Sequence, residues 1–266
     1  MPTKSEITPR QAKVLACIVK LNSETGKPVA SKELIDKGFF DVSGATLRNE
    51  MQALEEAGLI THPHTSSGRI PTDEGFRYFV NQLMGHVELS MKERQALKKE
   101  ILKLQAVNAE IGRRLAKMLS VHSSQASFAI LPEEVSSVGI SNILESDQLP
   151  VEDAKEIAKF FDNLDDYAEQ IISDYADKEP QTFIGKELTL SKGSDYSMIV
   201  SGVKLPSGKK GVIGLVGPKS MKYPKNISLM EYITKFLGGG GAAILLISIT
   251  LSLIHISEPT RQAEIS

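Results

Sequence analysis

The sequence has few cysteine and aromatic residues, and its N-terminus lacks a signal peptide. Its 266 residues include a single cysteine, Cys17, and no tryptophan, and aromatic residues make up 6% of the chain. One cysteine excludes an internal disulfide framework, and its place in the apolar pattern of the first helix predicts a small buried side chain. The opening residues, MPTKSEITPRQ, lack the apolar stretch of a signal peptide. We therefore expect a protein of the reducing cytoplasm.

The sequence also lacks a recognisable catalytic or metal-binding constellation. Its five histidines are scattered, and no carboxylate pair or Ser-His-Asp arrangement is present. His62 and His64 form an H-P-H pair, but no third or fourth ligand lies nearby, so ordinary histidines are favoured over metal ligands. We expect no enzyme activity, no cofactor and no metal.

Excess charge of either sign is missing as well. The formal net charge is -2 and 41% of the residues are hydrophobic, which is typical of a soluble chain with two modest domains. Residues 1 to 84 contain ten Lys plus Arg and ten Asp plus Glu. DNA-binding domains are usually basic, so any binding to DNA should depend more on base contacts than on non-specific attraction.

What the N-terminal part does contain is a clear series of helix signals. Thr8, Pro9 and Gln11 predict a capping box at the start of a first helix. A short helix follows, then a longer helix closed by Gly58, and then an aromatic-rich helix that packs on the core. These later helices are predicted to start at Ser31, Ser43 and Thr72.

The third predicted helix has one apolar and one polar face. Leu47, Met51 and Leu54 fall on one side of a helical projection. The opposite side carries small and amide side chains, and Arg48 lies on the flank. Asn and Gln pair with adenine and Arg with guanine, so this face suits base reading in the major groove. The alternative is a merely solvated face.

A short hairpin is predicted directly after this helix. LITHP and RIP have strand character, and HTSSG between them has no large apolar side chain. Its hydroxyl and backbone N–H groups, the close approach that Gly68 permits and the charge of Arg69 all suit phosphate oxygens. The residues expected to contact DNA are Ser31, Lys32, Ser43, Thr46, Arg48, Asn49, Gln52, His64, Thr65, Ser66, Ser67, Gly68 and Arg69.

Two segments resemble a known family. SGATLRNEMQALEEAGLITHPHTSSGRIPTDEGFRYFV resembles the winged-helix domain of HrcA, the heat-inducible transcription repressor of bacteria, and GVIGLVGPKSMKYPKNISLMEYITKFL is similar to the end of its GAF-like domain. The resemblance implies a repressor that binds, as a dimer, an inverted-repeat DNA operator upstream of chaperone genes. It also implies a chaperonin as partner. No association with a membrane is expected, because the apolar run near the end of the sequence is short for a membrane span.

Two departures from the family pattern stand out. Ser220 and Lys222 occupy positions where the family usually has Arg and Asp. Family members usually also carry an inserted dimerisation segment, for which residues 125 to 205 leave no room. A shortened chain needs another way to dimerise.

The segment after residue 84 offers one way. Leu97, Ile101, Leu104, Asn108, Ile111, Leu115 and Met118 recur at spacings of three and four residues. A heptad pattern with Asn at one a position is typical of a parallel two-stranded coiled coil. The alternative is a helix that packs on its own domain.

The second half is predicted to be an α+β domain. QASFAIL, SDYSMIVSGVKL and KKGVIGLVG have strand character, and VEDAKEIAKFFDNLDDYAEQIISDY has helical character. GAF-like domains often hold small ligands, but no convergent polar cluster marks a pocket in this sequence. A structural or partner-binding role is therefore favoured over an effector site. A protein-interaction module with a ligand-sensing GAF-like domain remains the alternative to a DNA-binding repressor.

The last residues differ in character from the rest. Four glycines precede an apolar run that is short for a membrane span, and LSLIHISEPTRQAEIS resembles translated sequencing-adapter sequence. We expect a tail that is not native to the protein, with a tail anchor as the alternative. The expected divisions are residues 1–84 as a winged-helix domain, 85–122 as a linker helix, 123–237 as a GAF-like domain and 238–266 as the tail.

Overall fold

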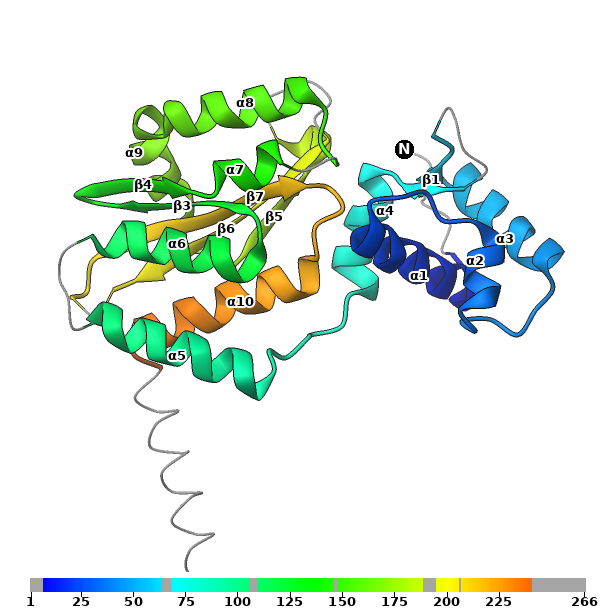
Figure 1. Cartoon of the computed structure of the whole chain (residues 1–266), viewed down its shortest axis with the longest axis horizontal. Coiled ribbons are helices and arrows are strands. Elements are labelled where there is room, and N and C mark those ends of the chain that lie inside the picture. The colour runs from blue at the N-terminus through cyan, green and yellow to red at the C-terminus, as the bar shows by residue number, and fades with distance from the viewer. Residues whose placement is uncertain are drawn as a thin grey trace, which may run out of the picture.

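The N-terminal half is a compact group of helices with a small hairpin (Figure 1). The computed structural model describes residues 7–63, 68–105, 110–145, 148–188, 195–205 and 207–240. Helices α1 (Pro9–Thr25), α2 (Ser31–Asp36) and α3 (Gly44–Glu56) come first. Strands β1 (Ile60–Thr61) and β2 (Ile70–Pro71) then pair antiparallel, and helix α4 (Asp73–Tyr78) follows.

The predicted helix starts are confirmed. Thr8 and Gln11 form the capping box of α1, with the Thr8 N–H 2.8 Å from Gln11 Oε1. Ser43 Oγ accepts a hydrogen bond from the backbone of Thr46, and Thr72 Oγ1 accepts one from the backbone of Gly75. Gly58 follows α3 with a φ of 74°, the left-handed conformation that favours glycine. These caps satisfy helix N–H groups that have no partner within the helix.

The C-terminal half is built on one five-stranded antiparallel sheet in the order β4-β3-β7-β6-β5. Its strands are β3 (Ala126–Leu131), β4 (Glu134–Val138), β5 (Gln181–Ile184), β6 (Tyr196–Lys204) and β7 (Lys210–Pro218). The three predicted strand segments are confirmed as β3, β6 and β7. Sheet and helices together confirm the α+β class.

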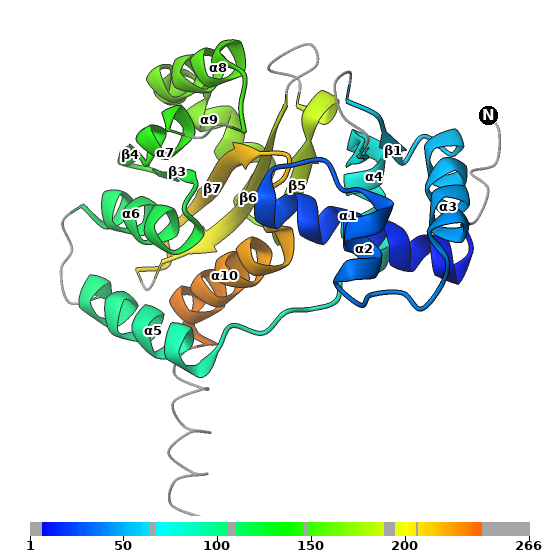
Figure 2. The same cartoon turned by 45° about the vertical axis from the view of Figure 1, so that its right-hand side comes forward.

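Helices cover both faces of this sheet (Figures 1 and 2). On one side lie α6 (Ile111–Ser123) and α10 (Tyr223–Lys235), with α5 (Met91–Gln105) beside them. On the other lie α7 (Ile140–Leu144), α8 (Val151–Asp162) and α9 (Leu164–Tyr175), so the helix predicted over residues 151–175 is two helices joined at Asn163. Short turns of helix, η1 (Phe79–Leu83), η2 (Gly185–Glu187) and η3 (Phe236–Gly240), complete the elements. Alternation along β3 sends Phe128 and Ile130 to the second side and Ala129 and Leu131 to the first.

The single heptad helix predicted after residue 84 is wrong. The structure has two helices, α5 and α6, which pack on each other within one chain. Any helix with one buried face has apolar residues at spacings of three and four, so the pattern did not distinguish this packing from a coiled coil. Of the predicted dimer residues, Asn108 lies outside the described residues, Ile111 is half-buried, and the remaining five are buried in the core of the chain: Leu97, Ile101, Leu104, Leu115 and Met118.

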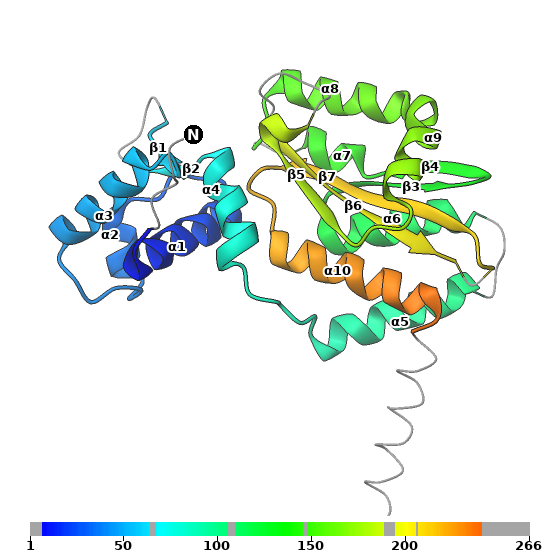
Figure 3. The ribbon, with the colours of Figure 1, turned by 180° about the vertical axis from the view of Figure 1, so that it is seen from behind.

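One hydrophobic core runs through both halves of the molecule. Helix α4 lies on the side of the N-terminal half that faces the sheet half (Figure 3). The ring of Phe76 in α4 lies 5.9 Å from that of Tyr223 at the start of α10. Beside them, Arg77 donates to both oxygens of the Glu187 carboxylate and, at 2.6 Å, to the carbonyl of Thr182. Helix α4 therefore contacts both the sheet half and the rest of the N-terminal half. Among the described residues, no helix has the length and apolar character needed to cross a membrane.

Candidate nucleic-acid interface

Helix α3 presents the polar face that the sequence predicts. Leu47, Met51 and Leu54 are buried in the core, where α1 and α2 pack against α3. Arg48, Asn49 and Gln52 are all exposed. The polar face is therefore open to solvent along the length of the helix.

The side chains on this face have local hydrogen bonds that a ligand can replace. Arg48 Nε donates to the carbonyl of Gly44 at 3.1 Å, and Gln52 Nε2 donates to Glu56 Oε1 at 3.1 Å. At the start of the helix, the hydroxyls of Ser43 and Thr46 lie 2.9 Å apart. Exposed bonds of this kind contribute little net free energy because water competes for the same groups.

The two predicted residues of α2 lie at its beginning. Ser31 is the first residue of the helix and is half-buried, whereas Lys32 is exposed. Helix α2 packs against α3, as the first helix of a helix-turn-helix packs against the second. Lys32 therefore exposes its side chain to solvent near the start of α2.

At the hairpin, Gly68 is more enclosed than the predicted contact with a phosphate requires. His64, Thr65, Ser66 and Ser67 lie outside the described residues. Gly68 is buried, and a Cβ atom added to it would lie 2.8 Å from Pro28 Cβ and 3.0 Å from the backbone N of Val29. The segment between α1 and α2 makes the close approach that requires this glycine, so packing accounts for it. Its contact with a phosphate stays a prediction.

Arg69 also differs from its prediction as a free phosphate ligand. Its Nε and Nη2 atoms each lie 3.0 Å from Glu55 Oε2, and its Nη1 lies 2.9 Å from Nδ1 of His62. The side chain is only 16% exposed. Its backbone also pairs with Val29, with N–O distances of 2.8 and 2.9 Å. Arg69 thus ties the hairpin to α3, and Glu55 neutralises its charge.

Glu55 is a partner of Arg69 that the sequence did not predict. It lies on α3, fourteen residues before Arg69. The predicted hairpin alone does not indicate which side chain of α3 Arg69 contacts. Within the described ranges, no group of three His, Cys, Asp or Glu side chains is placed to hold a metal ion. His62 contacts Arg69 instead.

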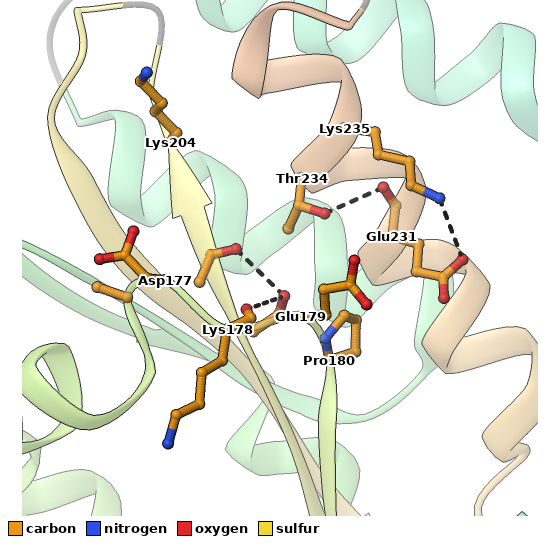
Figure 4. Close-up of a pocket in the computed structure, with 11 residues that line it drawn as sticks. Asp177, Lys178, Glu179, Pro180, Lys204, Glu231, Thr234 and Lys235 are labelled. Carbon is orange, nitrogen blue, oxygen red and sulfur yellow. Dashed lines mark hydrogen bonds and ion pairs between the residues drawn. The ribbon is translucent and has the colours of Figure 1, made fainter.

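A small cavity of about 320 Å³ lies in the sheet half, between the residues before β5, strand β6 and α10 (Figure 4). Its lining mixes charges of both signs, and Lys178 and Lys204 point away from one another. Lys235 lies 3.8 Å from Glu231. Mixed and divergent charges give no converging polar site for a ligand in this cavity.

Comparison with known proteins places the chain in a family. The family model described as "HrcA protein C terminal domain" matches residues 73–227, more than half of the chain. The chain is 51% identical over 89 residues to the heat-inducible transcription repressor HrcA of Arthrobacter sp. (strain FB24), covering 34% of this chain and 26% of that protein. It is 41% identical over 135 residues to HrcA of Acetivibrio thermocellus, covering 48% of this chain and 37% of that protein.

A solved structure shares the fold. A crystal structure described as that of a hypothetical protein matches 86% of this chain and 96% of its own, with a TM-score of 0.63 and 19% sequence identity. The match extends over both halves of the molecule. The chain spans about a quarter and somewhat more than a third, respectively, of the two HrcA proteins from Arthrobacter and Acetivibrio.

Proposed function

This chain belongs to the HrcA family, and we propose that it is a sequence-specific DNA-binding repressor of heat-shock genes that acts in the cytoplasm. In this proposal α1 to α4 and the β1-β2 hairpin form a winged helix-turn-helix, and the sheet half is a GAF-like domain. The observation that carries the proposal is the exposed polar face of α3, opposite its buried apolar face.

Helix α3 is the recognition helix. Its exposed amides, Asn49 and Gln52, suit the paired donor and acceptor of adenine, and Arg48 suits guanine. Breaking the Gln52–Glu56 and Arg48–Gly44 bonds costs little, so both side chains are free to reach base edges. The hydroxyls and N–H groups of Thr65, Ser66 and Ser67 are assigned to the sugar-phosphate backbone.

Charge explains why the base contacts matter in this proposal. Residues 1 to 84 have no net charge, and Glu55 neutralises Arg69. Little counterion release is then available to drive non-specific binding. In this proposal, base contacts made by α3 supply most of the discrimination between operator and other DNA.

A two-fold operator requires two copies of the chain, each reading one half-site. The protein is therefore proposed to bind an inverted repeat as a homodimer, with a chaperonin as the partner that sustains its active state. The buried sides of α5 and α6 are occupied within one chain, so the dimer uses other surfaces. Sedimentation velocity of the whole chain with an inverted-repeat duplex tests this: two chains per duplex are expected, and one chain contradicts it.

Duplex binding of single variants tests the role of α3. Asn49→Ala and Gln52→Ala should each lower the preference for the inverted-repeat chaperone operator over scrambled DNA by about 1–3 kcal/mol. Gln95→Ala removes an exposed amide from α5 and serves as the matched control, with no change expected. Equal losses on operator and scrambled DNA would contradict base reading by α3.

The neutral charge of the N-terminal half favours a second candidate, a winged helix that binds protein. The two candidates differ in salt dependence. The logarithm of the association constant for DNA falls linearly with the logarithm of the salt concentration, because phosphate contacts release counterions. A module that binds only protein shows no duplex binding with this slope.

A further inference from the structure

A cavity of about 580 Å³ lies where the two halves of the molecule meet. Helix α1 forms one side, the residues between η1 and α5 form another, and the start of α10 closes it. Cavities of this volume lie within the usual range for small-molecule sites, about 300–1,000 Å³. No feature of the proposed DNA contact involves this cavity.

Apolar groups form much of its wall. Ala16, Cys17, Phe39 and Phe79 line it and are only partly buried, and Val87 leaves 45% of its surface exposed. An exposed valine beside half-buried aromatic rings leaves apolar surface in contact with water. Covering this surface with an apolar ligand is favourable by about 25 cal/mol per Å².

Basic groups also line the cavity and outnumber acidic ones. They are Lys13, Lys20, His86, Lys222 and Lys225, against a single carboxylate, Glu24.

Some of these basic groups already have partners. Lys225 lies 3.3 Å from Glu93, the His86 ring lies 4.0 Å from Glu231, and Lys13 lies over the ring of Phe40. Among the described residues, Lys20 and Lys222 form no ion pair. One of these two free ammonium groups comes from each half of the molecule.

We propose that this cavity binds a small amphipathic carboxylate, with its apolar body against Cys17, Phe79 and Val87 and its head group near Lys20 and Lys222. A neutral apolar molecule would leave the lysine charges unused, and a highly charged anion would leave the apolar wall uncovered. Because the ligand touches both halves, it stabilises the arrangement in which α1 lies against the start of α10. The site lies between the halves rather than inside the sheet domain.

Cys17 provides a direct measure of occupancy. It is the single cysteine of the chain and lines the cavity, so modification by N-ethylmaleimide reports on access to this site alone. Decanoate, decanol and decyltrimethylammonium serve as probes that share a ten-carbon body and differ in head charge. Glutathione in the same solutions corrects for effects of the probes on the reagent.

Decanoate is expected to slow the modification of Cys17 at least tenfold at saturation, below the concentration at which it forms micelles. Decanol and the cationic probe should protect much less. Lys20→Gln with Lys222→Gln should raise the decanoate concentration for half-protection at least tenfold. Lys27→Gln removes an exposed lysine just beyond α1 and should leave it unchanged.

Absence of protection by decanoate overturns the proposal. Equal protection by decanol, or by decanoate in the double variant, overturns the assignment of the head group to these lysines. Each single variant is measured if the double variant fails to fold, as judged by circular dichroism. Since no DNA is present, a negative result leaves the repressor function untouched.

Discussion

The ammonium group of Lys219 lies 2.7 Å from the carboxylate of Asp73, and so connects the turn after β7 with the start of α4. A second carboxylate, Asp195, lies 2.8 Å from the same ammonium. Burial alone would lower the pKa of Lys219, but the hydrogen bonds with Asp195 and Asp73 outweigh it and raise the pKa. This partly buried triad holds the N-terminal half to the sheet half.

Removing the cation should loosen this connection. Lys219→Met leaves two carboxylates facing each other without a counter-charge, and we expect the free energy of unfolding to fall by about 2 kcal/mol. Lys209→Met is the matched control, because its pair with Glu133 is mostly exposed and should contribute little to stability. Urea denaturation measures both. Equal losses would show that the triad has no special role.

Because the pKa of Lys219 is raised, its contribution to stability is complete below pH 10.5, the ordinary value for lysine, and is lost as the pH rises through the folded value.

Freeing Arg69 should strengthen binding to every duplex. Glu55→Gln removes the charge that neutralises Arg69, so the guanidinium becomes available to a phosphate. We expect several-fold tighter binding to operator and scrambled DNA alike, and a log–log salt slope steeper by about 0.9. Glu152→Gln, an exposed change on α8, controls for net charge. An unchanged salt slope in Glu55→Gln would show that Arg69 remains structural.

Gly68→Ala separates packing from phosphate contact. The added methyl group would lie 2.8 Å from Pro28, and we expect a loss of about 1–3 kcal/mol in unfolding free energy. Gly85→Ala serves as control, because no atom lies within 4 Å of the added carbon. Thermal denaturation without DNA is the measurement. If Gly68→Ala keeps full stability and loses only affinity for DNA, the packing role is wrong.

Acid should weaken the start of α5. The Ser90 hydroxyl and backbone N–H donate to Glu93 at 2.7 and 3.0 Å and, with Lys225, lower the pKa of Glu93 to about 2. Its contribution to stability is therefore present above pH 4.5, the ordinary value for glutamate, and is lost as the pH falls through 2.

A variant isolates this contribution. Glu93→Gln should lower the unfolding free energy by about 1 kcal/mol or less at pH 7, and the difference from the parent protein should vanish near pH 2. Glu88→Gln, at an exposed partner of Arg94, should have no measurable effect at either pH. A gap between parent and Glu93→Gln that stays constant with pH contradicts the assignment.

Local signals in the sequence predicted much of the fold. The helix caps were predictable because each depends only on residues close together in the sequence. The side-chain oxygens of Thr8, Ser43 and Thr72 accept hydrogen bonds from N–H groups three residues later. The face of α3 was predictable for a similar reason, since its periodicity is contained in thirteen residues. Whether that face reads DNA stays a prediction.

What the sequence could not predict depends on distant partners. Glu55 and Arg69 meet because the hairpin folds back, and Gly68 is buried because Pro28 lies against it. Strand β4 was missed because its EVSSV is short and polar, and its pairing with β3 supplies the stability that its composition lacks. The heptad pattern gave a wrong prediction of a single long helix, because helices that pack within one chain and helices that pack between two chains have the same spacing of apolar residues.

One core runs from Val14 in α1, through Phe76 and Tyr223, to Ile213 in the sheet, so we expect the molecule to unfold as one cooperative unit. Heating should then produce one calorimetric peak rather than two, because neither half retains its buried surface once the other has melted. Under the function proposed above, this linkage connects thermal unfolding with the proposed contact with DNA. The temperature that melts the sheet would also dismantle the face of α3 that is proposed to read DNA.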